Sequence, residues 1–335
     1  MINKYTCFED YEAGQSGVTR MRTIGDPEIV SFAGITCDYS FLHLAAHQAE
    51  QTFYGGRIAH GLLGCSMAMG LLSLDAGHTV GRSVPGSYLS GFNINYRSAI
   101  YSGDTVRVEW NLVKKPPVNV SNGFGTIETH FKIINYKNEP VYDGVFRVNV
   151  KLRAASDDAM FSEPSSSTLW QPAEIPFDAV KDYNIRDFVV GTGGVTSGRT
   201  MTEADIVNFS GLTGDYNPIY VDEVYASSRG GRIVPPMLVF DWALGFWARD
   251  SWYARAKTDN TAQDIGHLGD NSIFLRPVRI GDTVHCIYQI KSVRVTKNNK
   301  EKHVVIYGLQ IVNQRNEVVQ EGEILVVKGN VGEYR

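Results

Sequence analysis

Residues 22–39 read RTIGDPEIVSFAGITCDY, and residues 199–216 read RTMTEADIVNFSGLTGDY. At a constant offset of 177 positions, nine of these eighteen residues are identical, which indicates an internal duplication. The offset is about half of the 335-residue chain, so each copy has the length of an ordinary domain. We therefore expect an N-terminal repeat at residues 1–152 and a C-terminal repeat at residues 183–335, joined by a Ser- and Pro-rich linker at residues 153–182.

The two copies diverge downstream of this shared stretch. The first copy continues to His43 and then reads GGRIAHG at residues 55–61, whereas the second continues to Tyr220 and reads GGRIVPP at residues 230–236. The first copy has thus kept an imidazole and a backbone N–H at positions where the second has a phenol and a proline, which has no N–H. This asymmetry indicates that the chemistry of the protein belongs to the first copy.

Each copy places its helical patterns before its strand patterns. Asp26, as N-cap, and Pro27 predict the start of a helix, and Thr202 with Asp205 resembles a capping box at the matching place. Helices are expected at 26–36, 45–53 and 59–74, with counterparts at 222–228 and 235–249. Alternating apolar patterns predict antiparallel strands at 87–96, 104–115, 123–135 and 141–151, and at 271–275, 282–293, 303–313 and 318–327. The turns SGDTV at 102–106 and IGDTV at 280–284 correspond at an offset of 178. The order favours an α+β fold in which a sheet wraps around a central helix.

The composition excludes several classes of protein. Hydrophobic residues make up 43% and charged residues 20% of the chain, as in ordinary globular proteins, and the net charge of −4 argues against a nucleic-acid partner. The apolar stretches are too short to span a bilayer, so no membrane partner is expected. The four cysteines form no C-x-x-C pair and no Cys/His spacing typical of a metal site, which favours reduced thiols and a cytoplasmic location.

Two segments resemble a known motif. Residues 213–222, TGDYNPIYVD, followed by GGRI, are similar to the hydratase motif of MaoC-like dehydratases, and residues 37–43, CDYSFLH, followed by GGRIAHGLL, resemble it too. The resemblance implies a double hotdog fold, in which two hotdog units lie side by side with joined sheets and an acyl thioester enters at their interface. The family pattern is roughly G-D-x-N-P-x-H, with Asp and His as the catalytic pair.

Carried onto this sequence, the resemblance implies one working site and one degenerate site. Asp38 and His43 are the expected catalytic pair, because two such groups around a tight turn can share one water molecule. Gly61 is the expected oxyanion donor at the start of the central helix, and losing such a donor typically costs on the order of 3 kcal/mol. The remaining site residues are His60 and Ser66, expected to contact the ligand or support the site, and the degenerate counterparts Asp215, Tyr220 and Pro236.

The implied activity is that of a hydro-lyase, which hydrates 2-enoyl thioesters or dehydrates (R)-3-hydroxyacyl thioesters of coenzyme A or an acyl-carrier protein. No metal or redox cofactor is expected, and a homodimer is left open. Two alternatives remain at this stage: a hotdog thioesterase, in which an acid directs water at the carbonyl carbon, and an acyl-thioester-binding protein without turnover. Cys37 invites interpretation as a nucleophile, but it lacks an accompanying motif with His and an orienting partner.

Overall fold

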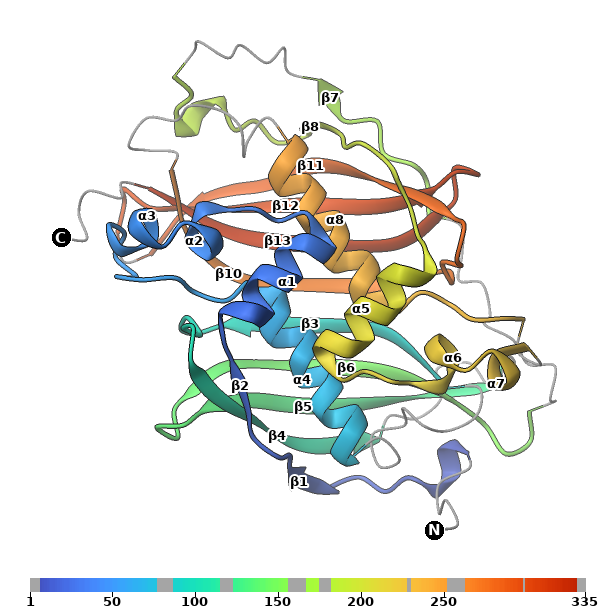
Figure 1. Cartoon of the computed structure of the whole chain (residues 1–335). Coiled ribbons are helices and arrows are strands. Elements are labelled where there is room, and N and C mark those ends of the chain that lie inside the picture. Colours follow the sequence, from blue (N-terminus) through green and yellow to red (C-terminus); the bar gives the residue numbers. More distant parts are fainter. Residues whose placement is uncertain are drawn as a thin grey trace.

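The computed structural model describes residues 7–76, 87–114, 123–155, 167–174, 182–227, 230–251, 263–297 and 299–329. Within these residues the strands form one 13-stranded sheet in the order β1-β4-β5-β6-β3-β10-β13-β12-β11-β8-β7, with β2 beside β4 and β9 beside β11 (Figure 1). The first repeat supplies β1 Ser16–Val18, β2 Arg22–Ile24, β3 Tyr88–Tyr96, β4 Asp104–Lys114, β5 Phe124–Asn135 and β6 Pro140–Lys151. After β7 Ala173–Glu174, the remaining strands are β8 Thr192–Val195, β9 Arg199–Thr200, β10 Gln263–Phe274, β11 Thr283–Val295, β12 His303–Asn313 and β13 Val318–Gly329.

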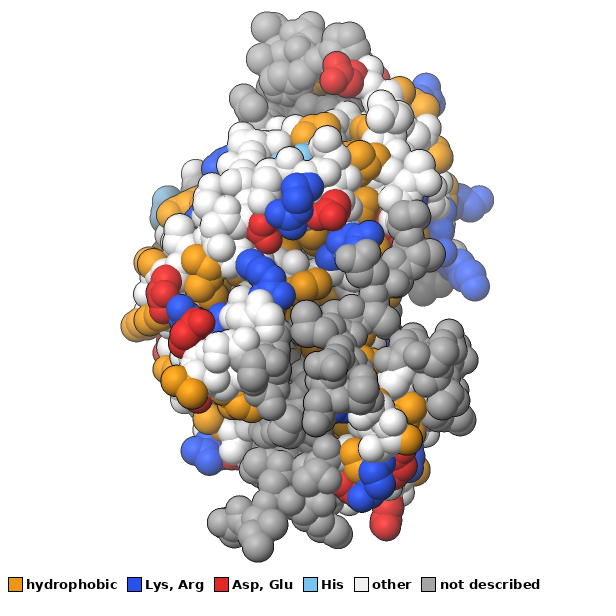
Figure 2. Space-filling view, turned by 90° about the vertical axis from the view of Figure 1, so that its right-hand side faces the viewer, with side chains coloured by type: hydrophobic (Ala, Val, Ile, Leu, Met, Phe, Trp, Pro, Cys, Tyr) orange, Lys and Arg blue, Asp and Glu red, His pale blue; other side chains and the backbone are white. Residues whose placement is uncertain are grey.

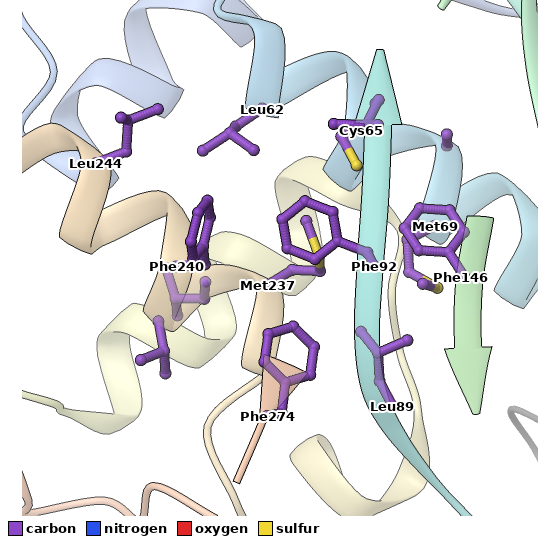
Figure 3. Packing of buried hydrophobic residues seen from close by; sticks show 14 of the residues in the cluster. Leu62, Cys65, Met69, Leu89, Phe92, Phe146, Met237, Phe240, Leu244 and Phe274 are labelled. Atoms are coloured by element: carbon purple, nitrogen blue, oxygen red, sulfur yellow. The ribbon is translucent and has the colours of Figure 1, made fainter. Parts of the chain in front are cut away.

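The longer helices lie together on one face of this sheet (Figure 1). They are α1 Asp26–Thr36 and α4 Gly61–Ala76 of the first repeat, and α5 Glu203–Thr213 and α8 Pro236–Asp250 of the second. Short helices follow α1 and α5: α2 Phe41–Leu44, α3 Ala46–Glu50, α6 Pro218–Val221 and α7 Glu223–Ser227. One hydrophobic cluster joins the two repeats, since side chains of α4, α8, β3 and β10 pack in it together (Figure 3). The α+β double hotdog architecture expected from the sequence is confirmed by this arrangement.

The seam between the repeats is the antiparallel pair of β3 and β10. Asn93 pairs with Asn271, which is the residue that corresponds to it in the second repeat at the offset of 178. On either side, Ile94 pairs with Asp270 and Phe92 pairs with Ser272. The same offset relates Ile94 to Ser272 and Phe92 to Asp270, so the two flanking pairs are equivalent. The seam therefore has a pseudo-twofold axis through the Asn93–Asn271 pair, as a symmetric dimer interface would.

Each central helix also packs closely against the other repeat. A Cβ placed on Gly245 of α8 would lie 2.0 Å from the carbonyl oxygen of Thr36, at the end of α1. The matching position in α4 is Gly70, where a Cβ would lie 1.9 Å from the carbonyl oxygen of Thr213. Only glycine allows these approaches, so the segment that follows α1 is held by a helix of the opposite repeat.

Several details differ from the predictions made from the sequence. The N-cap of α1 is Gly25 rather than Asp26, because the carboxylate of Glu28 accepts the Gly25 N–H at 2.9 Å; Asp26 is the first helical residue. The helix expected at 45–53 is two short helices, and β10 begins eight residues before the predicted strand. The short strands β1, β2, β7, β8 and β9 were not predicted. Most of the expected linker, residues 156–166 and 175–181, lies outside the described residues, as does Ser228.

In the described part of the chain, no helix has the length and apolar character needed to cross a bilayer. On the face drawn in Figure 2, Lys and Arg side chains are scattered among acidic and apolar ones and do not gather in one patch.

Candidate active site

The segment after α1 presents Asp38 at the end of a tight turn. Thr36 bonds the Phe32 carbonyl at 2.8 Å and accepts the Asp38 N–H at 3.4 Å, and Cys37 adopts a left-handed conformation with φ 68°. The Asp38 Oδ1 atom accepts the Ser40 N–H at 3.1 Å. Ser40 has nearly the same backbone angles as its counterpart Asn217, so the first repeat keeps this turn although it has Cys and Ser-Phe where the family pattern has Gly and Asn-Pro.

His43 lies in α2 and faces the interior. Its Nδ1 atom is 2.8 Å from the carbonyl oxygen of Ile58, which can only accept, so Nδ1 carries the hydrogen and Nε2 carries a lone pair. Burial lowers the pKa of His43 below its ordinary value, against the opposing charge of Asp38. The structure therefore holds a neutral imidazole with a free acceptor nitrogen beside a carboxylate.

His60 stacks on His43, with ring centroids 3.7 Å apart. Its Nε2 atom is 3.0 Å from the backbone carbonyl oxygen of Asp38, and its Nδ1 atom is buried without a hydrogen-bond partner among the described residues. Burial, together with the neighbouring His43, lowers the pKa of His60 to about 3. His60 thus joins the start of α4 to the turn that carries Asp38, and it does so uncharged at neutral pH.

Gly61 is the first residue of α4 and follows His60 directly. Its N–H donates to no described residue, as is usual for the first turn of a helix. A Cβ at this position would lie 2.6 Å from Cζ of Tyr96, so a larger residue would collide with that ring. The structure therefore brings Asp38, His43, His60 and Gly61 together.

Asp38, His43 and His60 could each offer one ligand atom to a metal ion, and these atoms lie within 4.8 Å of one another. No spacing in the sequence pointed to this group. Two imidazoles bound to one tetrahedral zinc ion at about 2 Å would have ring centres roughly 5 Å apart. The stacked rings of His43 and His60 are closer than this, so the arrangement does not fit a shared metal ion.

The counterpart site in the second repeat is closed. Asp215 is 2% exposed and its carboxylate accepts the Ser73 hydroxyl hydrogen at 2.9 Å, and Tyr220, at the position of the histidine, is 1% exposed. Pro236 begins α8 and has no N–H to donate. In the first repeat, by contrast, Asp38 remains partly exposed and Ala248 stands at the position that matches Ser73.

The hydroxyl of Ser66 bonds a residue of the second repeat rather than the group around Asp38. Ser66 is buried between the two central helices, where its hydroxyl donates to Asp241 of α8 at 2.8 Å. When the repeats are aligned so that Gly61 matches Pro236, Asp241 is the residue that corresponds to Ser66. Burial raises the pKa of Asp241 well above its usual range.

Three residues near Gly61 could not be predicted as site residues from the sequence. Tyr96 of β3 donates its hydroxyl hydrogen to Asp270 of β10, and His267 of β10 pairs with the same carboxylate. No motif marks these residues. Only an alignment of the two repeats at the offset of 178 distinguishes them. In that alignment, Tyr96, Asp270 and His267 correspond to Phe274, Phe92 and Leu89.

A model described as the MaoC like domain matches residues 11–130 and 189–311, and so covers most of both repeats. The chain belongs to the MaoC-like family. Its fold agrees with those of solved relatives: a putative MaoC domain dehydratase from Chloroflexus aurantiacus has a TM-score of 0.75 at 17% identity, with 98% of each chain covered. A Mycobacterium tuberculosis protein described as a double hotdog fold has a TM-score of 0.70 at 16% identity, with 98% of this chain and 100% of that chain covered.

Curated relatives of this MaoC-like chain match over shorter stretches. It is similar to a 3-hydroxybutyryl-CoA dehydratase of Methylorubrum extorquens, at 34% identity over 110 residues, which is 33% of this chain and 66% of that protein. It is also similar to an (R)-specific enoyl-CoA hydratase of Rhodospirillum rubrum, at 31% identity over 99 residues, which is 30% of this chain and 64% of that protein. Each alignment spans less than two thirds of the relative.

Proposed function

We propose that this MaoC-like protein is a hydro-lyase that adds water reversibly to 2-enoyl thioesters, forming (R)-3-hydroxyacyl thioesters, at one site in the first repeat. The observation that carries the proposal is the state of His43. Its Nδ1–H is committed to the Ile58 carbonyl, so a neutral Nε2 acceptor is left beside Asp38 in a buried site.

Asp38 and His43 would share the reacting water. One group accepts a proton as the water oxygen forms its bond to C3, and the electron pair of the C2–C3 double bond moves toward the thioester carbonyl. The proton is returned to C2 when the resulting enolate collapses, so no proton is gained or lost overall. The stacked His60 holds the Asp38 turn through its backbone carbonyl and needs no charge to do so.

Gly61 would stabilise the enolate oxygen. Its N–H has no partner among the described residues and lies at the positive end of α4, where developing negative charge is favoured. Ser66 would support the site indirectly, because its bond to Asp241 joins α4 to α8.

The second repeat would contribute walls and support rather than a second reaction centre. Its carboxylate is bonded, its histidine is replaced by a buried tyrosine and its helix begins with proline. The names of the two curated relatives support a thioester of coenzyme A as the substrate. A thioester of an acyl-carrier protein offers the same reacting atoms.

Matched asparagine variants test this proposal. Asp38→Asn should lower kcat/KM for hydration of crotonyl-CoA by about 10²- to 10⁴-fold, the usual range for removal of an acid–base group. Asp215→Asn, the same change in the closed site, should leave the rate within twofold. The reaction is followed by the loss of absorbance of the conjugated enoyl group, and His43→Ala should behave as Asp38→Asn does.

The same assay separates the alternatives. Free thiol released at the rate of absorbance loss would identify a thioesterase, and binding of enoyl thioesters without either signal would identify a binding protein. Equal losses in Asp38→Asn and Asp215→Asn would contradict a single site in the first repeat.

A further inference from the structure

A buried polar group lies at the seam of the repeats, next to the proposed oxyanion donor. The Asp270 carboxylate of β10 is fully buried; one of its oxygens accepts the hydroxyl hydrogen of Tyr96, and the other is 2.7 Å from Nε2 of His267. The Tyr96 ring packs against Gly61 and lies 4.9 Å from the His267 ring, centroid to centroid. Gly61 is thus connected through Tyr96 and Asp270 to a histidine of the second repeat.

The bond to Asp270 fixes which nitrogen of His267 is available. Because a carboxylate only accepts, Nε2 carries a hydrogen and is engaged, and Nδ1 makes no hydrogen bond with any described residue. The side chain of His267 is 29% exposed, whereas that of its partner Asp270 is not exposed at all. The imidazole is therefore anchored on one side and open to a ligand on the other.

His267 interacts electrostatically with the proposed catalytic pair. Burial alone would lower the pKa of His267, but the charge of Asp270, its hydrogen bond and the charge of Asp38 together raise it above the ordinary value. His267 in turn contributes to the lowered pKa of His43. A protonated His267 carries a hydrogen on both nitrogens, so Nδ1 can donate while Nε2 remains bonded to Asp270.

The same three positions are apolar around the closed site. At the offset of 178, the counterparts of Tyr96, Asp270 and His267 are Phe274, Phe92 and Leu89. Phe92 packs on Phe274 with ring centroids 6.1 Å apart and on Phe240 of α8 at 5.2 Å (Figure 3). A hydrophobic seam therefore satisfies the packing of this fold, so packing does not require the polar group on the other side.

We propose that His267 is a substrate-contacting residue which the second repeat supplies to the site of the first, and that its Nδ1–H donates a hydrogen bond to the oxygen bound at C3. This inference rests on the proposed function and deepens it. His267 makes and breaks no covalent bond; it holds the water that adds to the enoyl group, or the hydroxyl that leaves. Tyr96 and Asp270 act through it as positioning residues.

The variant His267→Gln distinguishes a contact between His267 and the substrate from a purely structural role of His267. The side-chain amide of His267→Gln can still donate to Asp270 in place of Nε2, but it has no group in place of Nδ1. We expect His267→Gln to lower kcat for crotonyl-CoA hydration by at least tenfold, with KM changed by less than threefold and an unchanged Tm. His267→Leu, which installs the residue of the closed side, should lose at least as much. A rate for His267→Gln within threefold of the parent would overturn the inference.

Binding measurements test the same contact without turnover. In an Asp38→Asn background, (R)-3-hydroxybutyryl-CoA should bind at least tenfold more tightly than butyryl-CoA, and adding His267→Gln should reduce this ratio by about threefold or more, with the remainder due to His43. A ratio that is one from the start, or that His267→Gln leaves unchanged, would overturn the contact with the C3 oxygen. The proposed function fails separately, if the parent and Asp38→Asn hydrate crotonyl-CoA equally or neither does.

Discussion

Two stacked imidazoles beside a carboxylate would normally be expected to take up a proton. Here both are kept neutral, because burial outweighs the attraction of Asp38 for a positive charge. The backbone carbonyls of Ile58 and Asp38 also fix one tautomer of each ring. Burial is thus the largest cause of the lowered pKa of both rings, and backbone atoms set their tautomers.

The neutrality of His60 predicts a pH dependence of stability. Its pKa is about 3 in the folded chain against 6.5 for the free side chain, so the unfolded state binds more protons between these values. Stability should therefore fall as the pH is lowered below 6.5, by about 1.4 kcal/mol per pH unit for this group. His60→Gln keeps a donor for the Asp38 carbonyl and should remove that part of the slope. Urea unfolding of both proteins at pH 5 and pH 7 measures it; equal slopes would mean that His60 is protonated in the folded state.

The residues of the site differ in how far the sequence could predict them. Asp38, His43, His60 and Gly61 lie within about 25 residues of one another in a motif, so the expected site was recognisable before the fold. His267 was not, because it comes from the other repeat and reaches the site only through the pairing of β3 with β10. Ser66 was expected to contact the ligand or support the site, and the structure shows its hydroxyl bonded to Asp241 in the contact between the central helices.

At the scale of helices and strands, the turn that carries Asp38 depends on a helix of the opposite repeat. Gly245 of α8 allows the backbone at Thr36 to approach, and a Cβ there would also lie 3.1 Å from the Asp38 nitrogen. Gly70 makes the equivalent contact with the turn of the closed site. This crossed arrangement brings the second repeat into direct contact with the turn that carries Asp38.

A matched pair of alanine variants tests the effect of this contact. Gly245→Ala and Gly70→Ala create similar collisions with backbone atoms, and each should destabilise the protein by about 1–3 kcal/mol. Only Gly245→Ala should also lower kcat at a temperature where both variants are folded, since it displaces the segment that carries Asp38. Thermal unfolding and crotonyl-CoA hydration measure the two effects. Equal losses of kcat in both variants would contradict a specific link to Asp38.

Helices and strands with a long apolar period could be predicted from the sequence, whereas strands set by contacts with distant segments could not. The central helices and the long strands of both repeats follow the apolar pattern of the sequence to within a few residues, except for β10. The first part of β10 reads QDIGHLGD, in which apolar and polar residues do not alternate regularly. Its strand conformation is set by pairing with β13 and β3, and it carries His267 and Asp270. The short strands β1 and β2 are likewise set by pairing with β4 rather than by their own pattern.

For the whole molecule, the repeats share too much structure to unfold separately. They have one sheet across β3 and β10, one hydrophobic cluster, and the crossed glycine contacts. Separating them would expose the edges of β3 and β10 and the buried pair of Ser66 and Asp241.

We therefore expect one cooperative transition in urea. Hydrogen–deuterium exchange at increasing urea should give β5 of the first repeat and β12 of the second the same midpoint. Circular dichroism should follow the same curve. Two transitions, one for each repeat, would show that the seam contributes little to stability.

The pseudo-twofold seam has an evolutionary consequence. In a homodimer of identical subunits every substitution occurs twice, so a polar side chain that suits one site must also be accommodated at the other. Covalent linkage of the two copies removes that restriction, and β3 and β10 show the result: Leu89 on one side of the axis and His267 on the other. The fused chain behaves as a heterodimer whose partners are always present in equal amounts, and whose two halves can specialise independently.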